Sequence, residues 1–112
     1  MTVEPRHANT AGIAHGGLLT SIMDTASGAA VAHQPSIGGK GVTTVSLQVT
    51  YLAPTFVGDT ITATARLRGR GRRILTVAVE AENQQGETLA IGICTLRVRS
   101  GDGAIEARPR RS

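Results

Sequence analysis

One helix-like segment followed by four strand-like segments limits what this chain can fold into. From Gly16 to about Ala32, apolar residues recur every three or four positions, as on one face of an α-helix. After residue 41 the period changes to two: apolar and polar residues alternate at about 44–51, 60–67 and 75–82, and a fourth strand-like segment follows at about 88–99. One helix against four antiparallel strands is an α+β layer arrangement. Because a helix of about 16 residues and a strand of seven or eight are both roughly 24 Å long, the sheet can wrap around the helix.

The two periods also assign side chains to faces. The buried stripe of the helix is expected to combine Leu18, Ile22 and Ala29 with Leu19, Met23, Ala26 and Ala30. Asp24 then lies on the flank of that stripe, with Thr20 and Ser27. In the first strand, Val45, Leu47, Val49 and Tyr51 should share one face, opposite Thr44, Ser46, Gln48 and Thr50.

The segments between and beyond these elements carry further signals. A short edge strand is expected around Val3, and residues 34–41 are expected to form a loop. Gly69 and Gly71 predict a hairpin turn between the second and third strands. The last strand is apolar on both faces in its middle, which indicates a central position or an interface.

The composition indicates one globular domain with an aliphatic core. The chain has 112 residues, 40% hydrophobic and 18% charged, and Tyr51 and Phe56 are its only Tyr, Phe or Trp residues. A single sheet layer needs more cover than one helix provides, so we expect dimerisation to complete the core. We assign residues 1–99 to the domain and 100–112 to a flexible basic tail. Cys94 lies in an apolar stretch and is expected to be a small buried side chain rather than a reactive thiol.

The net charge of +4 does not by itself select a partner. The arginines gather in a predicted turn and in the tail: Arg68, Arg70, Arg72, Arg73, Arg108, Arg110 and Arg111. Aromatic stacking platforms and a basic recognition helix are missing, so we expect no nucleic-acid partner, and a small phosphorylated ligand accounts for the charge at least as well. With no secretory leader and no apolar run of membrane-spanning length, we expect a cytoplasmic protein without a membrane partner.

The residues best suited to chemistry lie between Asn9 and Asp24. Gly16 and Gly17 stand where the helix begins, and the first amides of a helix lack internal partners. Such a helix start can bind the developing oxyanion of an acyl group, although two glycines can also serve only to turn the chain. Asp24 is either a nucleophile or general base, or a solvated helix residue. His15 is either an acid or base, or a hydrogen-bonding group that supports the turn. No metal-ligand spacing, P-loop, dinucleotide fingerprint or nucleophile elbow is present.

Together these residues resemble a known family. The pattern of Asn9, Gly12, His15, Gly16 and Gly17, followed by Asp24, resembles the hotdog-fold acyl-CoA thioesterases of the phenylacetic-acid-degradation (PaaI-like) type, in the 4-hydroxybenzoyl-CoA thioesterase superfamily. Residues 49–54 and 58–67 are similar to the second and third strands of that family. The resemblance covers about residues 9–98 and implies an antiparallel sheet wrapped around one long central helix. Relatives carry a longer stretch before the asparagine, so we expect here a very short first strand or a later start.

The resemblance implies hydrolysis of an acyl-CoA thioester to the free acid and CoA. Asp24 would act as the nucleophile or as the general base that activates water, and the Gly16 backbone amide would polarise the thioester carbonyl. Asn9 would hold the attacking water or the substrate, His15 would orient the loop, and Thr44 would assist Asp24. In this family the site spans a dimer interface, so Asp24 of one chain would face Asn9 and Gly16 of a second chain.

The resemblance also implies the ligands and the assembly. Coenzyme A is part of the substrate, and we expect no separate cofactor and no metal. Gly17 is a candidate substrate-binding residue, as are Arg66, Arg68 and Arg72, although solvated hairpin arginines are the simpler interpretation of each. We expect a homodimer or a dimer of dimers, that is, a homotetramer. The alternatives are a non-catalytic acyl-CoA-binding hotdog module, a hotdog hydratase or dehydratase, and, most remotely, nucleic-acid binding by the tail.

Overall fold

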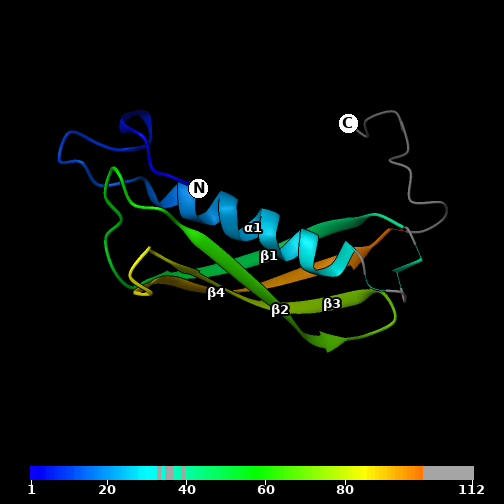
Figure 1. Cartoon of the computed structure of the whole chain (residues 1–112). Helices are drawn as coiled ribbons and strands as arrows, with labels where there is room; N and C mark the ends of the chain where they lie inside the picture. The colour runs from blue at the N-terminus through cyan, green and yellow to red at the C-terminus, as the bar shows by residue number, and fades with distance from the viewer. Residues whose placement is uncertain (33, 35–36, 39, 100–112) are drawn as a thin grey trace, which may run out of the picture.

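One helix lies across a four-stranded antiparallel sheet in the computed structural model, which describes residues 1–32, 34, 37–38 and 40–99 (Figure 1). The helix α1 spans Gly16–Ala32, and the strands are β1 Val42–Tyr51, β2 Thr62–Arg70, β3 Ile74–Glu82 and β4 Thr88–Val98. A short 3-10 helix, Pro5–His7, precedes α1. The predicted helix, the four strands and the α+β class are confirmed. The predicted tail, residues 100–112, lies outside the described residues, as does part of the predicted loop.

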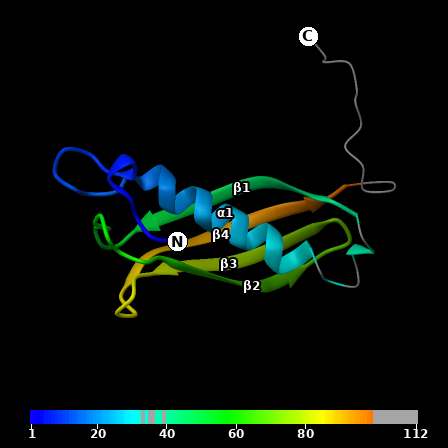
Figure 2. The same cartoon turned by 45° about the horizontal axis from the view of Figure 1, so that its top comes forward.

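The strand order is β1-β4-β3-β2, so β4 is central, as its apolar middle predicted (Figure 2). All three neighbouring pairs are antiparallel. The edge strand expected around Val3 is reduced to a single bridge between Thr2 and Thr60, next to which the Val3 amide donates to the Asp59 carbonyl at 2.8 Å. None of the helices in the described part of the chain is both long and apolar enough to cross a bilayer.

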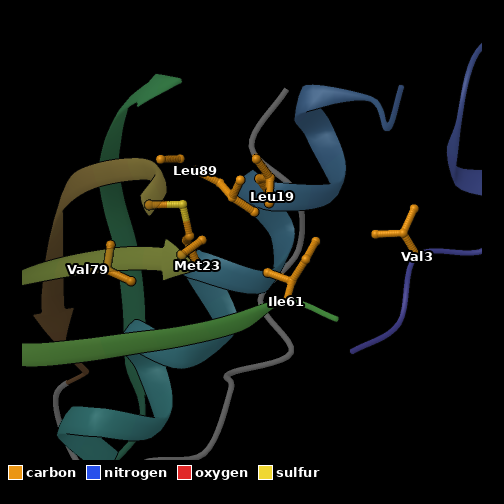
Figure 3. Packing of buried hydrophobic residues seen from close by; sticks show 8 residues of the cluster. Val3, Leu19, Met23, Ile61, Val79 and Leu89 are labelled. Carbon is orange, nitrogen blue, oxygen red and sulfur yellow. The ribbon is translucent and has the colours of Figure 1, made fainter. Parts of the chain in front are cut away.

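The core lies between α1 and the concave face of the sheet. Met23 and Leu19 of the helix point toward Val79 and Leu89, and all four are buried (Figure 3). Truncating a fully buried Met side chain such as Met23 to Ala typically costs about 2–5 kcal/mol. A second buried cluster lies toward the end of the helix and contains Val31, Ile37, Leu75, Val77, Cys94 and Leu96.

The buried stripe of α1 follows positions four residues apart, and this corrects part of the prediction. It runs through Leu19, Met23, Ser27 and Val31, whereas Ala29, expected in the stripe, is exposed. Ser27 was expected on the flank but is fully buried. Its hydroxyl donates to the Met23 carbonyl at 2.8 Å, and this bond back to the preceding turn is what allows a serine in the core.

A β-bulge in β1 changes which residues face the helix. Thr44 pairs with Leu96 and Ser46 pairs with Thr95, which leaves Val45 as an extra residue between them. Val45 is 57% exposed, so the prediction that it shares the buried face with Leu47 is wrong. An extra residue interrupts the alternation of faces, and Thr44 therefore joins the helix-facing side.

The β2–β3 hairpin also differs from the prediction. β2 continues to Arg70, and Gly69 lies inside the strand at a register shift rather than in the turn. Of the two glycines, Gly71 makes the turn, where its amide donates to the Ile74 carbonyl at 2.7 Å. Arg68 and Arg70 are consequently strand residues, because the shift at Gly69 lets the ladder continue past Leu67.

Candidate active site

Asp24 is held by a hydrogen bond from β1. It lies near the middle of α1 and is partly exposed, and the Thr44 hydroxyl donates to its Oδ1 at 2.7 Å. Within the described residues, no hydrogen bond engages Oδ2. The bulge after Thr44 is what allows this threonine to face the helix. The arrangement orients a carboxylate through one oxygen and leaves the other available to a reactant.

Cys94 lies beneath this pair and is fully buried. Its burial raises the pKa of the Cys94 thiol, and the negative charge of Asp24 raises this pKa further. Hydrogen bonds with Ser27 and Thr44 lower the pKa, but the net change is upward. A thiol with a raised pKa stays protonated at neutral pH and is a poor nucleophile. The prediction of a small buried side chain at Cys94 is confirmed.

The start of α1 offers two backbone amides. Within the described part of the chain, the N–H groups of Gly16 and Gly17 have no hydrogen-bond partner, whereas the Leu18 amide donates to the His15 carbonyl at 3.0 Å. The His15 amide donates to the His7 carbonyl at 2.9 Å, which ties the segment before the helix to the N-terminal loop. Free amides at the positive end of the helix dipole suit an oxyanion or a carbonyl oxygen.

The two glycines differ in the space around them. A Cβ at Gly16 would lie 3.0 Å from Cζ and 3.1 Å from the hydroxyl oxygen of Tyr51, whereas a Cβ at Gly17 would meet no heavy atom within 4 Å. The ring of Tyr51 therefore explains the glycine at position 16. The open space expected for a ligand near the backbone occurs at Gly17.

Tyr51 is the residue at this site that sequence reasoning missed. It ends β1, and its hydroxyl donates to the Gly16 carbonyl at 3.0 Å and hydrogen-bonds with the Thr20 hydroxyl. The residue was assigned only to a buried strand face, yet it is 49% exposed. The one signal in the sequence is the residue type, because Tyr combines an apolar ring with a hydroxyl that can bond a polar group.

Asn9 and His15 support the loop before the helix. The Asn9 Oδ1 accepts from the amides of Ala11 at 2.9 Å and Ile13 at 3.2 Å, in a turn that Gly12 enters with a positive φ of 80°. Both Asn9 and His15 have exposed side chains. Within one chain, no hydrogen bond among the described residues joins either of them to Asp24.

The structure does not bring the predicted arginines to Asp24. Arg66 and Arg68 lie on β2, and Arg72 lies in the turn that follows, whereas Thr44 lies on β1 at the other edge of the sheet. Arg66 instead lines a groove of about 490 Å³ on the face of the sheet away from α1, together with the half-exposed Ile91 and Ile93. In a single chain these arginines belong to a different surface.

A second groove, of about 460 Å³, lies at the start of the helix. Ile13, Gly16, Leu19 and Tyr51 are among its lining residues. Its walls are mainly apolar, and it includes the residue that carries one of the two free amides. This groove suits an apolar group attached to a carbonyl. No cluster of residues able to hold a metal ion occurs in the described ranges.

An antiparallel sheet wrapped around one long helix is the arrangement of the hotdog fold. The family model described as the thioesterase superfamily matches residues 11–90, and the chain belongs to that superfamily. The solved structure of PaaI from the phenylacetic acid degradation operon of Escherichia coli superimposes with a TM-score of 0.83 at 34% identity, over 90% of this chain and 70% of that one.

Similar sequences carry thioesterase names. The chain is 36% identical over 91 residues to acyl-coenzyme A thioesterase PaaI of Escherichia coli, covering 81% of this chain and 62% of that protein. It is 32% identical over 93 residues to acyl-coenzyme A thioesterase 13 of Mus musculus, covering 82% of this chain and 65% of that protein. The chain thus spans a little under two thirds of the length of these relatives.

A hypothetical thioesterase from Streptococcus pneumoniae has been solved with coenzyme A. It superimposes with a TM-score of 0.80 at 26% identity, over 88% of this chain and 74% of that one. The same bacterial protein has also been solved in two variants, one with an aspartate and one with a threonine replaced by alanine.

Proposed function

We propose that this protein hydrolyses an acyl-CoA thioester to the free acid and coenzyme A. The observation that carries the proposal is the Asp24 carboxylate, oriented by Thr44 through one oxygen in a member of the thioesterase superfamily. The names of the related acyl-coenzyme A thioesterases support the same substrate class. Coenzyme A enters as part of the substrate, and the reaction needs no other cofactor.

Asp24 acts in this proposal as the nucleophile or as the general base. As a base, its free Oδ2 takes a proton from water while the water oxygen attacks the thioester carbon, and the CoA thiolate leaves. As a nucleophile, the same oxygen attacks the carbon, the C–S bond breaks and the CoA thiolate leaves, and water later hydrolyses the resulting anhydride to regenerate Asp24. In both routes the carbonyl oxygen gains negative charge, which the Gly16 amide stabilises at the helix start.

Both groups cannot act on one carbonyl within a single chain. Gly16 and Asp24 are eight residues apart on α1, and at 1.5 Å per residue their backbones lie about 12 Å apart along the axis. A reacting carbonyl needs its oxygen about 3 Å from the amide and its carbon close to the attacking oxygen. We therefore place Asp24 of one chain opposite Gly16 and Asn9 of a second chain.

The β1 edge is where a second copy would complete the site. Among the described strands, β1 has a ladder partner on one side only, β4, and it carries Thr44 at the site. The outer groove, which Ile91 and Ile93 line together with Arg66, offers a further surface on which two such dimers could pair. A homotetramer built as a dimer of dimers follows from using both surfaces.

A panel of acyl-CoA substrates with a thiol-reactive dye tests the activity. Asp24→Asn should lower kcat by about 10²-fold or more, because a positioned base or nucleophile contributes about that much. Glu82→Gln removes a carboxylate from β3 and should leave kcat unchanged. Equal turnover in wild type and Asp24→Asn would refute the proposal. Tight acyl-CoA binding without turnover would favour a binding module, and enoyl-CoA hydration would favour a hydratase.

Coexpression of two inactive variants tests whether the site spans two chains. Asn9→Asp keeps the Oδ atom that accepts from Ala11 and Ile13 but loses the amide donor, so the loop should hold while activity falls. When Asn9→Asp and Asp24→Asn chains are coexpressed in equal amounts, about half of the dimers contain one chain of each variant. Each of these heterodimers has one intact site of two, so about a quarter of wild-type activity should return. If both groups acted within one chain, no activity would return.

A further inference from the structure

Tyr51 holds the first turn of α1 from the end of β1. Its hydroxyl donates to the Gly16 carbonyl at 3.0 Å and hydrogen-bonds with Thr20 one turn later. Its ring covers Gly16 so closely that a Cβ there would lie 3.0 Å from the ring carbon Cζ. The first turn of the helix is thus fixed by one side chain through both a hydrogen bond and van der Waals contact.

The bond to the Gly16 carbonyl also determines the direction of the next amide. The Gly16 C=O and the Gly17 N–H belong to one planar trans peptide unit and point in opposite directions. A donor that fixes the carbonyl oxygen therefore fixes the N–H at the other end of the unit. It also polarises that N–H, because hydrogen bonds in a chain strengthen one another.

The Gly17 amide is available to a ligand. Its N–H has no partner within the described residues, and the space where a Cβ would stand is open. Tyr51 and Gly16 both line the apolar groove of about 460 Å³ at the helix start. Gly16, which supplies the carbonyl of the fixed peptide unit, thus lies at the wall of this groove, and the exposed Gly17 follows directly after it.

We propose that Tyr51 is a positioning residue that aims the Gly17 N–H at the thioester carbonyl oxygen, so that Gly17 acts as a second oxyanion donor beside Gly16. The inference rests on the proposed thioesterase function and adds a residue to it. Tyr51 acts through the Gly16–Gly17 peptide unit. The chain has one tyrosine, so no neighbouring tyrosine can replace it.

Tyr51→Phe is the sharpest test, because it keeps the ring against Gly16 and removes only the hydroxyl. We expect kcat to fall about tenfold, less than the loss of an oxyanion donor itself. KM should stay within about a factor of two, because the bond acts mainly as charge develops on the carbonyl oxygen. Thr76→Val removes a hydroxyl from β3, outside the residues that line either groove, and should leave kcat and KM unchanged.

A second measurement separates positioning from general support of the fold. In ¹⁵N–¹H spectra, Tyr51→Phe should shift the Gly17 amide resonance, and Thr76→Val should not. Wild-type kcat in a folded Tyr51→Phe protein, or an unmoved Gly17 resonance, would overturn the inference. If the wild type shows no Asp24-dependent hydrolysis, the proposed function fails separately, and the Gly17 resonance alone decides whether Tyr51 positions that amide.

Discussion

The two ends of β1 meet the helix in different ways. At the Thr44 end, the contact is one hydrogen bond between an exposed hydroxyl and a partly exposed carboxylate. At the Tyr51 end, a ring packs against the backbone and its hydroxyl bonds a carbonyl and a second hydroxyl. Leu47 and Val49 pack against the core between them. The first contact orients a carboxylate and stabilises the fold little, whereas the second restricts the backbone of the helix start.

Substituting Thr44 should have the larger effect, and it should be on activity. A hydrogen bond to a charged group contributes about 1.5–3 kcal/mol, so Thr44→Val should lower kcat by roughly 10- to 100-fold if the bond acts in the transition state. Thr44→Ser keeps the hydroxyl and should retain most of the activity. The melting temperature should change little in either variant, because Thr44 is exposed. A Thr44→Val protein as active as Thr44→Ser would show that the bond has no role in turnover.

The smaller effect, on stability, is expected at the Tyr51 end. Gly16→Ala places a methyl group 3.0 Å from the Tyr51 ring and should lower the free energy of unfolding by about 1 kcal/mol. In a Tyr51→Ala background this loss should disappear, because the ring is gone and alanine is the better helix former. Gly17→Ala, with open space around it, should be neutral or stabilising.

Urea unfolding of the four proteins that combine these two substitutions, with Gly17→Ala beside them, measures this coupling. Additive effects of Gly16→Ala and Tyr51→Ala would mean that the ring does not limit residue 16. Together with the Thr44 pair, the series tests whether one end of β1 serves activity and the other serves the geometry of the backbone.

Local sequence patterns were sufficient to predict the helix and the strands, but not which side chains of β1 face the helix. The helix and the four strands follow from periods of 3.6 and two residues, which depend on neighbours in the sequence. Strict alternation would place the side chains of Thr44 and Leu47 on opposite faces of β1. Because of the bulge at Val45, both lie on the helix-facing side instead. A bulge depends on how β1 pairs with β4, so no pattern within β1 itself indicates it.

The candidate site shows the same difference between what the local sequence predicts and what tertiary packing decides. Asn9, Gly16 and Asp24 were identified by resemblance, and their chemistry follows from residue type and from the amides that every helix start leaves free. The contacts that orient them join residues distant in the chain: Thr44 lies 20 residues from Asp24, and Tyr51 lies 35 residues from Gly16. Such pairs depend on the packing of the helix on the sheet.

The sequence by itself determined the fold class, the order of the elements and the segment proposed to carry the site, because these depend on local periodicity and on the family pattern. Only the tertiary structure decided that Thr44 faces Asp24, that Ser27 is buried and that Tyr51 covers Gly16. The physical reason is that a side chain's face and partner depend on strand register and on the layer packed above it, and both are settled when distant segments meet.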